Sequence, residues 1–288
     1  MPAPPSQGDR PPENPSTGEP AAKMEGVAGA LPEELSTVSV VCTVPTYNES
    51  ENILDLSRAL LNLGSNVQVL VVDDDSPDGT WRLVAEAGKD EPRLQLLHRT
   101  QDRGRGAAGR DGFVRALEMG ADYVIEMDAD FSHHPRYIPE MLARLAAGRG
   151  NRDVGLSGAR PLGLVLGSRA VAGGADADRG LVRRWVTKTA NAYIRVLLGL
   201  RVGDCNSGFR AWPAETLRKI RVEDTFSPGP AIVQELLYKT ARAGYGIEEV
   251  PIQFVDRERG DSTLTWKILL QGYTAVLKLR LLSWMGKL

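Results

Sequence analysis

The stretch VQVLVVDDDSPDGT, Val67 to Thr80, contains the unit from which the rest of the fold can be worked out. Its first half is aliphatic and rich in valine, which predicts a buried β-strand, and three aspartates follow where that strand ends. The Asp, Ser, Pro and Gly residues after them are typical of a turn, and Asp78 is a candidate cap for a helix that begins next. We therefore expect a strand, a turn and a helix, with acidic side chains at the carboxyl end of the strand.

The same alternation of strand and helix extends in both directions along the chain. It predicts an α/β fold, with a mostly parallel central sheet covered by helices on both faces. Ligands of such sheets bind beyond the carboxyl ends of the strands, which is where the unusual polar residues fall. Asn48 and Glu51 are a candidate capping box for the first helix. The other predicted strands are TVSVVCTVP, LQLLHR and DYVIEM, and the predicted helices include ESENILDLSRALLNLG and GAAGRDGFVRALEMG.

Composition limits the classes of protein to consider. The chain has 288 residues, 42% of them hydrophobic, and its formal net charge of -2 gives no overall attraction to nucleic acid. Cys42 and Cys205 lack a C-x-x-C spacing, which argues against a disulfide framework or a zinc site and favours the reducing cytoplasm. No signal peptide and no apolar run of ~20 residues is found, so membrane contact is expected to be peripheral or through a membrane-anchoring partner protein.

The two ends of the chain differ from its centre and from each other. Residues 1–36 are acidic and hold eight of the eighteen prolines, which predicts a disordered tail before a globular domain over residues 37–262. Residues 263–288 contain four basic residues, no acidic residue, and the two tryptophans Trp266 and Trp284. This C-terminal segment is expected to form a helix that lies on an anionic membrane surface, or one that packs on the domain or a partner.

A second strand ends on paired charge, in VIEMDADFSHHP from Val124 to Pro135. Asp128 and Asp130 can point to one side of the chain and offer the hard oxygen ligands that Mg²⁺ or Mn²⁺ prefers. A metal bound there would bridge the phosphates of a substrate such as a sugar diphosphate. The alternative is a turn with solvated acids, and the adjacent His133 and His134 are read as loop residues.

Asp73 directly follows VLVV at the mouth of the predicted site, where its carboxylate can accept N–H groups of a nucleotide base. Tyr47 and Glu49, in PTYNE after the first strand, can lie near the same base. The alternative for Asp73 is a solvated turn acid, and for Tyr47 and Glu49 it is capping and edge packing. The G-x-G of DRGRGAAG does not follow the first strand, so a dinucleotide site is disfavoured.

Six motifs in order resemble the family 2 glycosyltransferases, and within them the dolichyl-phosphate or polyprenyl-phosphate mannose synthases. The resemblance implies the A-type glycosyltransferase fold, with a Rossmann-like central sheet, and makes residues 37–262 the catalytic domain. It covers most of the chain beyond the tail. The motifs are VPTYNE, VVDDDSPDGT, MDADFSHHP, GSRAVAGG, NSGFRAW and VPIQFVDRERGDS.

The resemblance also implies roles for individual residues. The nucleotide pocket would contain Pro45, Tyr47, Glu49 and Asp73, and the metal would be held by Asp128, Asp130 and Ser132, where the family often has glutamine. The phosphate groups would be bound by Arg169, Arg183, Thr187, Arg257 and Ser262, with Asp130, Arg169, Arg183 and Arg257 taking part in the transfer. Thr263 replaces the lysine of the family motif, which removes one phosphate-binding cation.

The implied activity is transfer of mannose from GDP-mannose to a polyprenyl (dolichyl) phosphate, with inversion, at the cytoplasmic face of a membrane. A phosphate acceptor is already an anion at neutral pH and needs no general base, in contrast to a sugar hydroxyl. Two alternatives stay open. One is a family 2 transferase that uses another nucleotide sugar, such as UDP-glucose, or a hydroxyl acceptor, and the other is a regulatory subunit that only binds nucleotide sugars.

Overall fold

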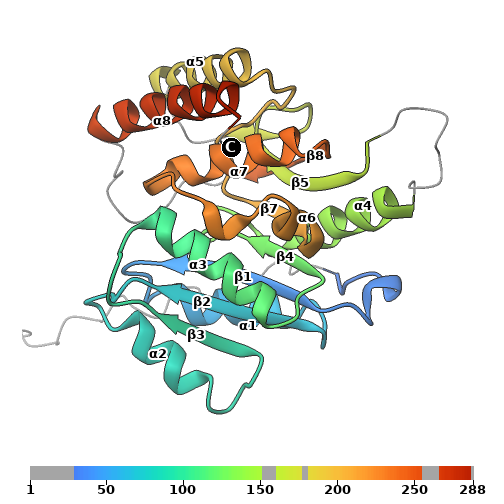
Figure 1. Cartoon of the computed structure of the whole chain (residues 1–288). Helices are drawn as coiled ribbons and strands as arrows, with labels where there is room; N and C mark the ends of the chain where they lie inside the picture. Colours follow the sequence, from blue (N-terminus) through green and yellow to red (C-terminus); the bar gives the residue numbers. More distant parts are fainter. Residues whose placement is uncertain (1–28, 151–159, 177–180, 255–265, 287–288) are drawn as a thin grey trace, which may run out of the picture.

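The computed structural model describes residues 29–150, 160–176, 181–254 and 266–286. Its centre is a seven-stranded sheet with helices on both faces, which confirms the predicted α/β class (Figure 1). The strand order is β3-β2-β1-β4-β7-β5-β8, and β6 pairs with β9 in a separate two-stranded sheet. The strands are β1 Val40–Thr46, β2 Val67–Asp73, β3 Leu94–His98, β4 Tyr123–Glu126, β5 Leu162–Ser168, β6 Ala175–Asp176, β7 Arg210–Pro213, β8 Gly246–Pro251 and β9 Gln253–Phe254.

The sheet is mostly parallel, as predicted, with one exception. Strand β1 is parallel to β2 and β4, β2 is parallel to β3, and β5 is parallel to β8. Strand β7 is antiparallel to both of its neighbours, β4 and β5. It therefore runs back across the sheet, and the segment before it arrives at the carboxyl end of β4.

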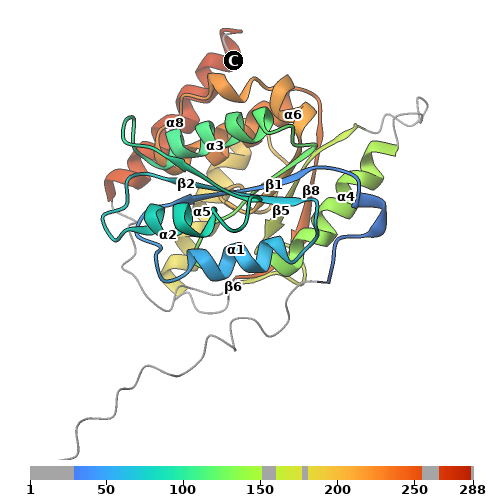
Figure 2. The same cartoon turned by 90° about the horizontal axis from the view of Figure 1, so that it is seen from below.

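Two hydrophobic cores lie on opposite faces of the sheet, because successive residues of a strand point to opposite sides. Val40, Cys42 and Val44 belong to the core beneath α1 and α4, whereas Val41 belongs to the core beneath α3 and α7. Figure 2 shows α1 and α4 below the sheet and α3 and α6 above it. The helices are α1 Ile53–Leu61, α2 Thr80–Ala87, α3 Arg105–Glu118, α4 Ile138–Gly150, α5 Leu181–Leu198, α6 Ala214–Lys219, α7 Ile232–Arg242 and α8 Trp266–Trp284, with short 3-10 turns at Glu33–Leu35, Pro135–Tyr137, Val222–Asp224 and Gly229–Ala231.

The segment just before β1 is ordered, which corrects the predicted tail boundary at residue 36. Leu31 and Leu35 are buried in the core beneath α1, and the Leu31 N–H donates to the Leu63 carbonyl at 2.8 Å. The Asn66 amide donates to the Leu35 carbonyl at 2.7 Å. Leu31 and Leu35 are the sequence signal for this packing, but the surrounding prolines and acidic residues favour the interpretation as a disordered tail. Residues 1–28 lie outside the described residues.

Two N-terminal deletions are expected to differ sharply in stability. Removing residues 1–28 should leave the midpoint of thermal unfolding unchanged, because a proline-rich, acidic segment with few large apolar residues buries little surface. Removing residues 1–35 also removes two buried leucine side chains, each worth about 1.5 to 3 kcal/mol, so the free energy of unfolding should fall by several kcal/mol. Equal midpoints for the two deletions, measured by calorimetry, would contradict the packing of residues 29–35.

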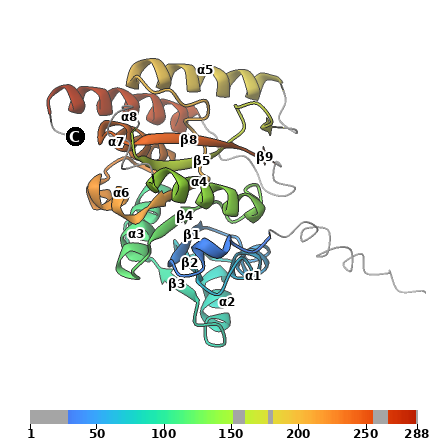
Figure 3. The same ribbon diagram turned by 90° about the vertical axis from the view of Figure 1, so that its right-hand side faces the viewer.

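Helices α5 and α8 lie side by side at one end of the molecule (Figure 1, Figure 3). One face of α8 packs on the domain, where Val276 and Leu279 are buried and the Tyr238 hydroxyl donates to Ser283 Oγ at 2.9 Å. The other face leaves large apolar side chains in solvent. They are Leu277, Leu281, Trp284 and Met285, with Trp284 70% exposed. One face of α8 thus packs on the domain, and the membrane alternative stays a prediction for the other.

No helix within the described ranges is long and apolar enough to cross a lipid bilayer.

Both cysteines are buried and free. Cys42 lies in β1, and Cys205 lies in the segment that leads to β7. Burial raises the pKa of each thiol to about 12. The thiols are therefore protonated at neutral pH and serve as small apolar groups in the two cores.

Candidate active site

The carboxyl ends of four neighbouring strands come together at one edge of the sheet. The register pairs Thr46 of β1 with Asp73 of β2, and Asp73 with His98 of β3. On the other side of β1, Glu126 of β4 pairs with Thr43, so the chain after β4 continues along the same edge. The chain runs from β1 to β2 and β3 on one side of β1 and then crosses to β4 on its other side. Ligands of open α/β sheets bind at such a reversal of strand order.

The Asp73 carboxylate is fully buried and holds the loop after β2. It accepts hydrogen bonds from Thr46 Oγ1 at 2.8 Å and from the Ser76 N–H and hydroxyl at 2.8 and 2.6 Å. None of its surface is available to a ligand. In this structure Asp73 positions the loop, and its predicted contact with a nucleotide base stays a prediction.

The loops after β1 and β2 are joined by hydrogen bonds from one to the other. The Asn48 N–H donates to Ser76 Oγ at 3.0 Å, and the Glu49 N–H donates to Thr80 Oγ1 at 3.0 Å. Asn48 has a left-handed backbone with φ of 61°, five residues before α1, so the predicted capping box with Glu51 is wrong. Asp78 does accept the Thr80 N–H at 3.0 Å at the start of α2, which is close to the helix-capping role predicted for it.

A cavity of about 330 Å³ opens beside these two loops. The predicted residue Tyr47 lines this cavity together with Asp75, Trp81, Arg82 and Arg103. The Tyr47 residue is 53% exposed. The Arg103 guanidinium lies over the Tyr47 ring at 5.9 Å, and the Arg82 guanidinium lies over the Trp81 ring at 4.7 Å. Aromatic and guanidinium faces of this kind stack on flat ligands, and the cavity has the size of a small-molecule site.

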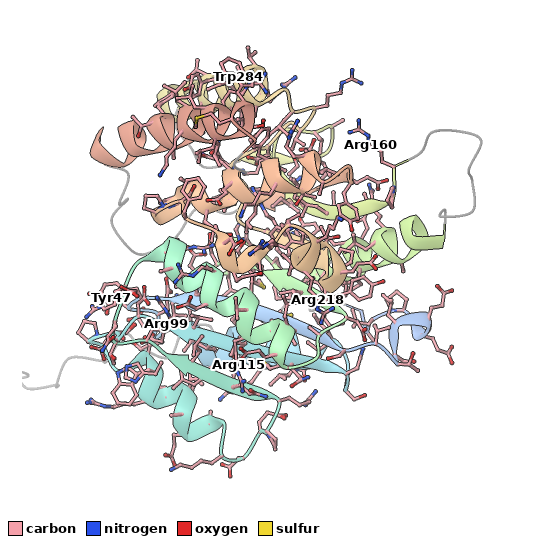
Figure 4. The ribbon with its side chains drawn as sticks, viewed as in Figure 1. Tyr47, Arg99, Arg115, Arg160, Arg218 and Trp284 are labelled. Atoms are coloured by element: carbon pink, nitrogen blue, oxygen red, sulfur yellow. The ribbon has the colours of Figure 1, made fainter. Side chains whose placement is uncertain are left out.

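Two other residues predicted for the nucleotide pocket are not among the residues that line this cavity. Pro45 pairs with Val72 within the sheet, and the Glu49 carboxylate accepts from the Asn52 amide at 3.0 Å. Figure 4 shows Tyr47 at the edge of the molecule. Arg99 is buried and bridges Asp74 to Asp111, which anchors the segment that carries Arg103. Asp75, Trp81, Arg82 and Arg103 were not predicted for this cavity, because DDDSPDGT and DRGRG carry the signals of a turn and of a helix start.

Asp128 and Asp130 lie in the loop that follows β4, as predicted. The Asp128 side chain is 35% exposed, and its N–H donates to His133 Nδ1 at 3.2 Å. His133 is buried and stacks on Phe209, and burial lowers the pKa of its imidazole, so the ring is neutral at pH 7. His134 caps the 3-10 turn that follows, accepting the Arg136 N–H at 3.1 Å. Both histidines therefore build the loop, as the sequence indicated.

The oxygen atoms of this loop fit a divalent cation. The Asp130 carboxylate accepts the Ser132 N–H at 3.1 Å, and the buried Ser132 hydroxyl has no hydrogen-bond partner among the described residues. Among all the residues that the structure describes, no group of three or more His, Cys, Asp or Glu side chains could hold a metal ion. Two carboxylates and an orphaned hydroxyl are hard donors suited to Mg²⁺ or Mn²⁺, and a bound diphosphate would supply further oxygens.

A buried ion pair lies directly beneath Asp128. Glu126, at the end of β4, is fully buried, and its Oε1 accepts from Arg105 Nη1 at 2.8 Å. Arg105 Nη2 lies 3.7 Å from Asp128 Oδ1, so one guanidinium faces both carboxylates. The second oxygen of Glu126 is buried without a hydrogen-bond partner in the described structure. This pair was not predictable, because Glu126 lies within the predicted strand DYVIEM and its partner is 21 residues away in the sequence.

Arg169 follows β5 and forms a two-pronged ion pair with Asp204. Its Nε lies 2.7 Å from Asp204 Oδ2, its Nη2 lies 2.9 Å from Oδ1, and its guanidinium covers the Phe254 ring at 5.0 Å. Burial acts to raise the pKa of Asp204, but the hydrogen bonds and charge of Arg169 hold it below the usual value. The binding of phosphate by Arg169 stays a prediction. In this structure Arg169 fixes the segment before NSGFR through its ion pair with Asp204.

That segment reaches the predicted metal ligands. A Cβ atom at Gly208 would lie 3.6 Å from Asp128 Oδ1, which places NSGFR against the carboxylate. Arg210 is fully buried and donates to the carbonyls of Ser207 and Cys205 at 2.6 and 3.2 Å. Burial lowers the pKa of Arg210 to about 10. Arg210 thus holds the loop from within the core.

The remaining predicted phosphate ligands are only partly described. Arg183 and Thr187 are one helical turn apart in α5, and Thr187 is half-buried. The side chain of Arg183 lies outside the description, as do Arg257 and Ser262 entirely. Their proposed contacts with phosphate stay predictions.

The pattern of this site agrees with one large family of enzymes. Residues 41–220 match the family described as Glycosyl transferase family 2. The chain belongs to glycosyl transferase family 2. Its seven-stranded, mostly parallel sheet is the A-type glycosyltransferase fold that the motifs implied.

Relatives in this family are similar over most of their length. The chain is 38% identical over 231 residues to the undecaprenyl-phosphate mannosyltransferase of Micrococcus luteus, covering 80% of this chain and 89% of the relative. It is 36% identical over 230 residues to the polyprenol monophosphomannose synthase of Mycolicibacterium smegmatis, covering 80% and 82% of the two proteins.

Solved structures show the same fold at lower identity. Glucosyl-3-phosphoglycerate synthase of Mycobacterium tuberculosis, in complex with UDP, superposes with a TM-score of 0.60 at 22% identity, covering 85% of this chain and 81% of that one. Mannosyl-3-phosphoglycerate synthase of Rubrobacter xylanophilus gives a TM-score of 0.55 at 20% identity, covering 87% and 76%.

Proposed function

We propose that this glycosyltransferase transfers mannose from GDP-mannose to a polyprenyl (dolichyl) phosphate, giving polyprenyl-phosphate β-mannose and GDP. The observation that carries the proposal is its similarity to the mannosyltransferase of Micrococcus luteus, which extends over 89% of that relative. Supporting it, the cavity beside Tyr47 and the carboxylates of the Asp128 loop lie at one edge of the sheet.

The donor would lie along this edge. Its base would occupy the cavity lined by Tyr47 and Trp81, and its diphosphate would reach Asp128 and Asp130. Those two carboxylates, with Ser132, would hold Mg²⁺ or Mn²⁺, and such an ion supplies charge stabilisation for the departing diphosphate. Complexes of glucosyl-3-phosphoglycerate synthase with Mn²⁺ and UDP-glucose are consistent with a divalent cation in this fold.

The acceptor needs orientation more than activation. A phosphate monoester has a second pKa of about 6, so one of its oxygens can attack the anomeric carbon directly at neutral pH. That C–O bond forms as the bond to the β-phosphate oxygen of GDP breaks, which inverts an α-linked donor to a β-linked product. The proposed work of Arg169, Arg183, Thr187, Arg257 and Ser262 is to hold the acceptor anion in line for this displacement.

A lipid acceptor also gives the exposed face of α8 a use. We place the enzyme at the cytoplasmic face of a membrane, with Leu277, Leu281, Trp284 and Met285 toward the lipid or toward a membrane-anchoring partner protein. Tryptophan and basic residues on one helix are typical of a segment that lies in the membrane interface. Lys278 and Arg280 on the same helix would meet anionic headgroups, each worth about 1 kcal/mol near the surface.

GDP release is the assay that tests this function. The full chain with Mn²⁺ and GDP-mannose is expected to release GDP only when a polyprenyl phosphate is added, and not with the matching polyprenol. A panel containing UDP-glucose and GDP-glucose reports the donor. Release with the polyprenol would indicate a hydroxyl acceptor, and binding of GDP-mannose without release under any condition would indicate a regulatory subunit.

A further inference from the structure

The third aspartate of DDDSPDGT faces the cavity, in contrast to the first two. Asp73 and Asp74 are buried, with 0% and 6% of their surface exposed. The Asp75 side chain is 42% exposed and lines the cavity beside Tyr47 and Trp81. Its left-handed backbone, with φ of 58°, turns it away from its two neighbours. Asp75 is therefore an acidic group placed at the edge of whatever flat ligand the cavity binds.

The Asp75 carboxylate is held in place by two side chains. His98 Nε2, at the end of β3, lies 2.9 Å from Oδ1, and Arg103 Nη1 lies 3.7 Å from Oδ2. His98 in turn stacks on Trp81, with ring centroids 4.3 Å apart and planes 13° apart. The groups that hold the carboxylate thus belong to the same aromatic and cationic walls that would sandwich a base. The position of Asp75 is therefore fixed relative to the Trp81 ring and the Arg103 guanidinium.

A carboxylate in this position distinguishes bases by their hydrogen-bond donors. An ionised carboxylate only accepts hydrogen bonds, and its two oxygens can take two parallel N–H groups. The Watson–Crick edge of guanine offers two adjacent donors, N1–H and N2–H. Uracil offers one N–H between two carbonyl oxygens, which a carboxylate repels. Resting on the proposed function, we propose that Asp75 is the residue that selects guanine over uracil nucleotides.

The test measures binding of GDP and of UDP to the full-length protein in Mn²⁺ by calorimetry. The wild type is expected to bind GDP about 100-fold more tightly than UDP, as two charge-assisted hydrogen bonds allow. Asp75→Ala and Asp75→Asn should weaken GDP binding by about 30- to 100-fold and leave UDP binding within a few-fold. The matched control is Asp90→Asn, an exposed acid beyond α2 that should change neither affinity. Unchanged thermal unfolding midpoints establish that the variants are folded.

The possible failures are distinguishable. A wild type that binds UDP as tightly as GDP, or more tightly, would overturn the GDP donor in the proposed function, and the selection by Asp75 with it. A wild type that prefers GDP, and keeps the same preference in both Asp75 variants, would overturn only the role of Asp75. Equal losses of GDP and UDP binding would also overturn the role of Asp75, because Asp75 would then support the cavity without distinguishing guanine from uracil.

Discussion

Replacing Asp128 or Asp130 by alanine is expected to lower the transfer rate by roughly a thousandfold, because a metal ion contributes several kcal/mol of charge stabilisation to the transition state. Both side chains lie in the loop after β4, and the Asp128 carboxylate is partly exposed. The fold should survive, since neither is part of the cores. Transfer of labelled mannose to polyprenyl phosphate measures the loss, and titration with Mn²⁺ should show weaker metal-dependent binding of GDP.

The matched control is Asp122→Ala. Asp122 precedes β4 at the opposite end of the strand and accepts the Ser39 N–H at 2.9 Å, so its loss should leave transfer near the wild-type rate. Chelation of the wild-type enzyme by EDTA should reproduce the defect of the Asp128 variant, and Mn²⁺ should reverse it. Undiminished activity in EDTA would remove the metal from the proposed mechanism, whatever the variants show.

The second large effect concerns stability. Arg105→Ala should lower the free energy of unfolding by about 3 to 5 kcal/mol, because it leaves the fully buried Glu126 carboxylate without its hydrogen-bonded cation. If the uncompensated charge is the cause, Arg105→Ala combined with Glu126→Gln should be more stable than Arg105→Ala alone. Denaturant unfolding of the wild type, both single variants and the double variant measures this coupling.

Arg115 provides the control on the same helix. Its pair with Glu118 spans 3.3 Å between two half-exposed side chains, and Figure 4 shows Arg115 well away from Tyr47. Exposed pairs contribute about 0 to 1 kcal/mol, so Arg115→Ala should be nearly neutral. A double variant no more stable than Arg105→Ala would mean that the loss comes from the packing of the arginine stem.

The fold was largely predictable because its signals are local. Valine-rich runs such as the one ending at Asp73 specify buried strands, and the spacing of strand and helix specifies a parallel sheet. The direction of β7 was not predictable, because a run of four residues, Arg210–Pro213, carries no information about its neighbours. Leu31 and Leu35 show the same limit, since two leucines near prolines reveal nothing about the Leu63 carbonyl that Leu31 reaches or the Asn66 amide that reaches Leu35.

Some residues of the candidate site were likewise predictable from the sequence and others were not. Asp128 and Asp130 could be placed from the strand that precedes them. The pairs Arg105–Glu126 and Arg169–Asp204 join residues 21 and 35 positions apart, and only the folded sheet brings them together. Asp73 and Asp75 were not distinguishable by sequence, because the backbone turn at Asp75 decides which carboxylate is buried and which meets the cavity.

The burial of both cysteines makes the native protein unreactive toward thiol reagents. Only a thiolate attacks a maleimide readily, and with pKa values of about 12 neither Cys42 nor Cys205 supplies one near neutral pH. Trp284→Cys would then be a uniquely labelled position on the exposed face of α8, needing no removal of native cysteines. A polarity-sensitive dye attached there can follow, in real time, whether and how fast this helix leaves water when vesicles are added.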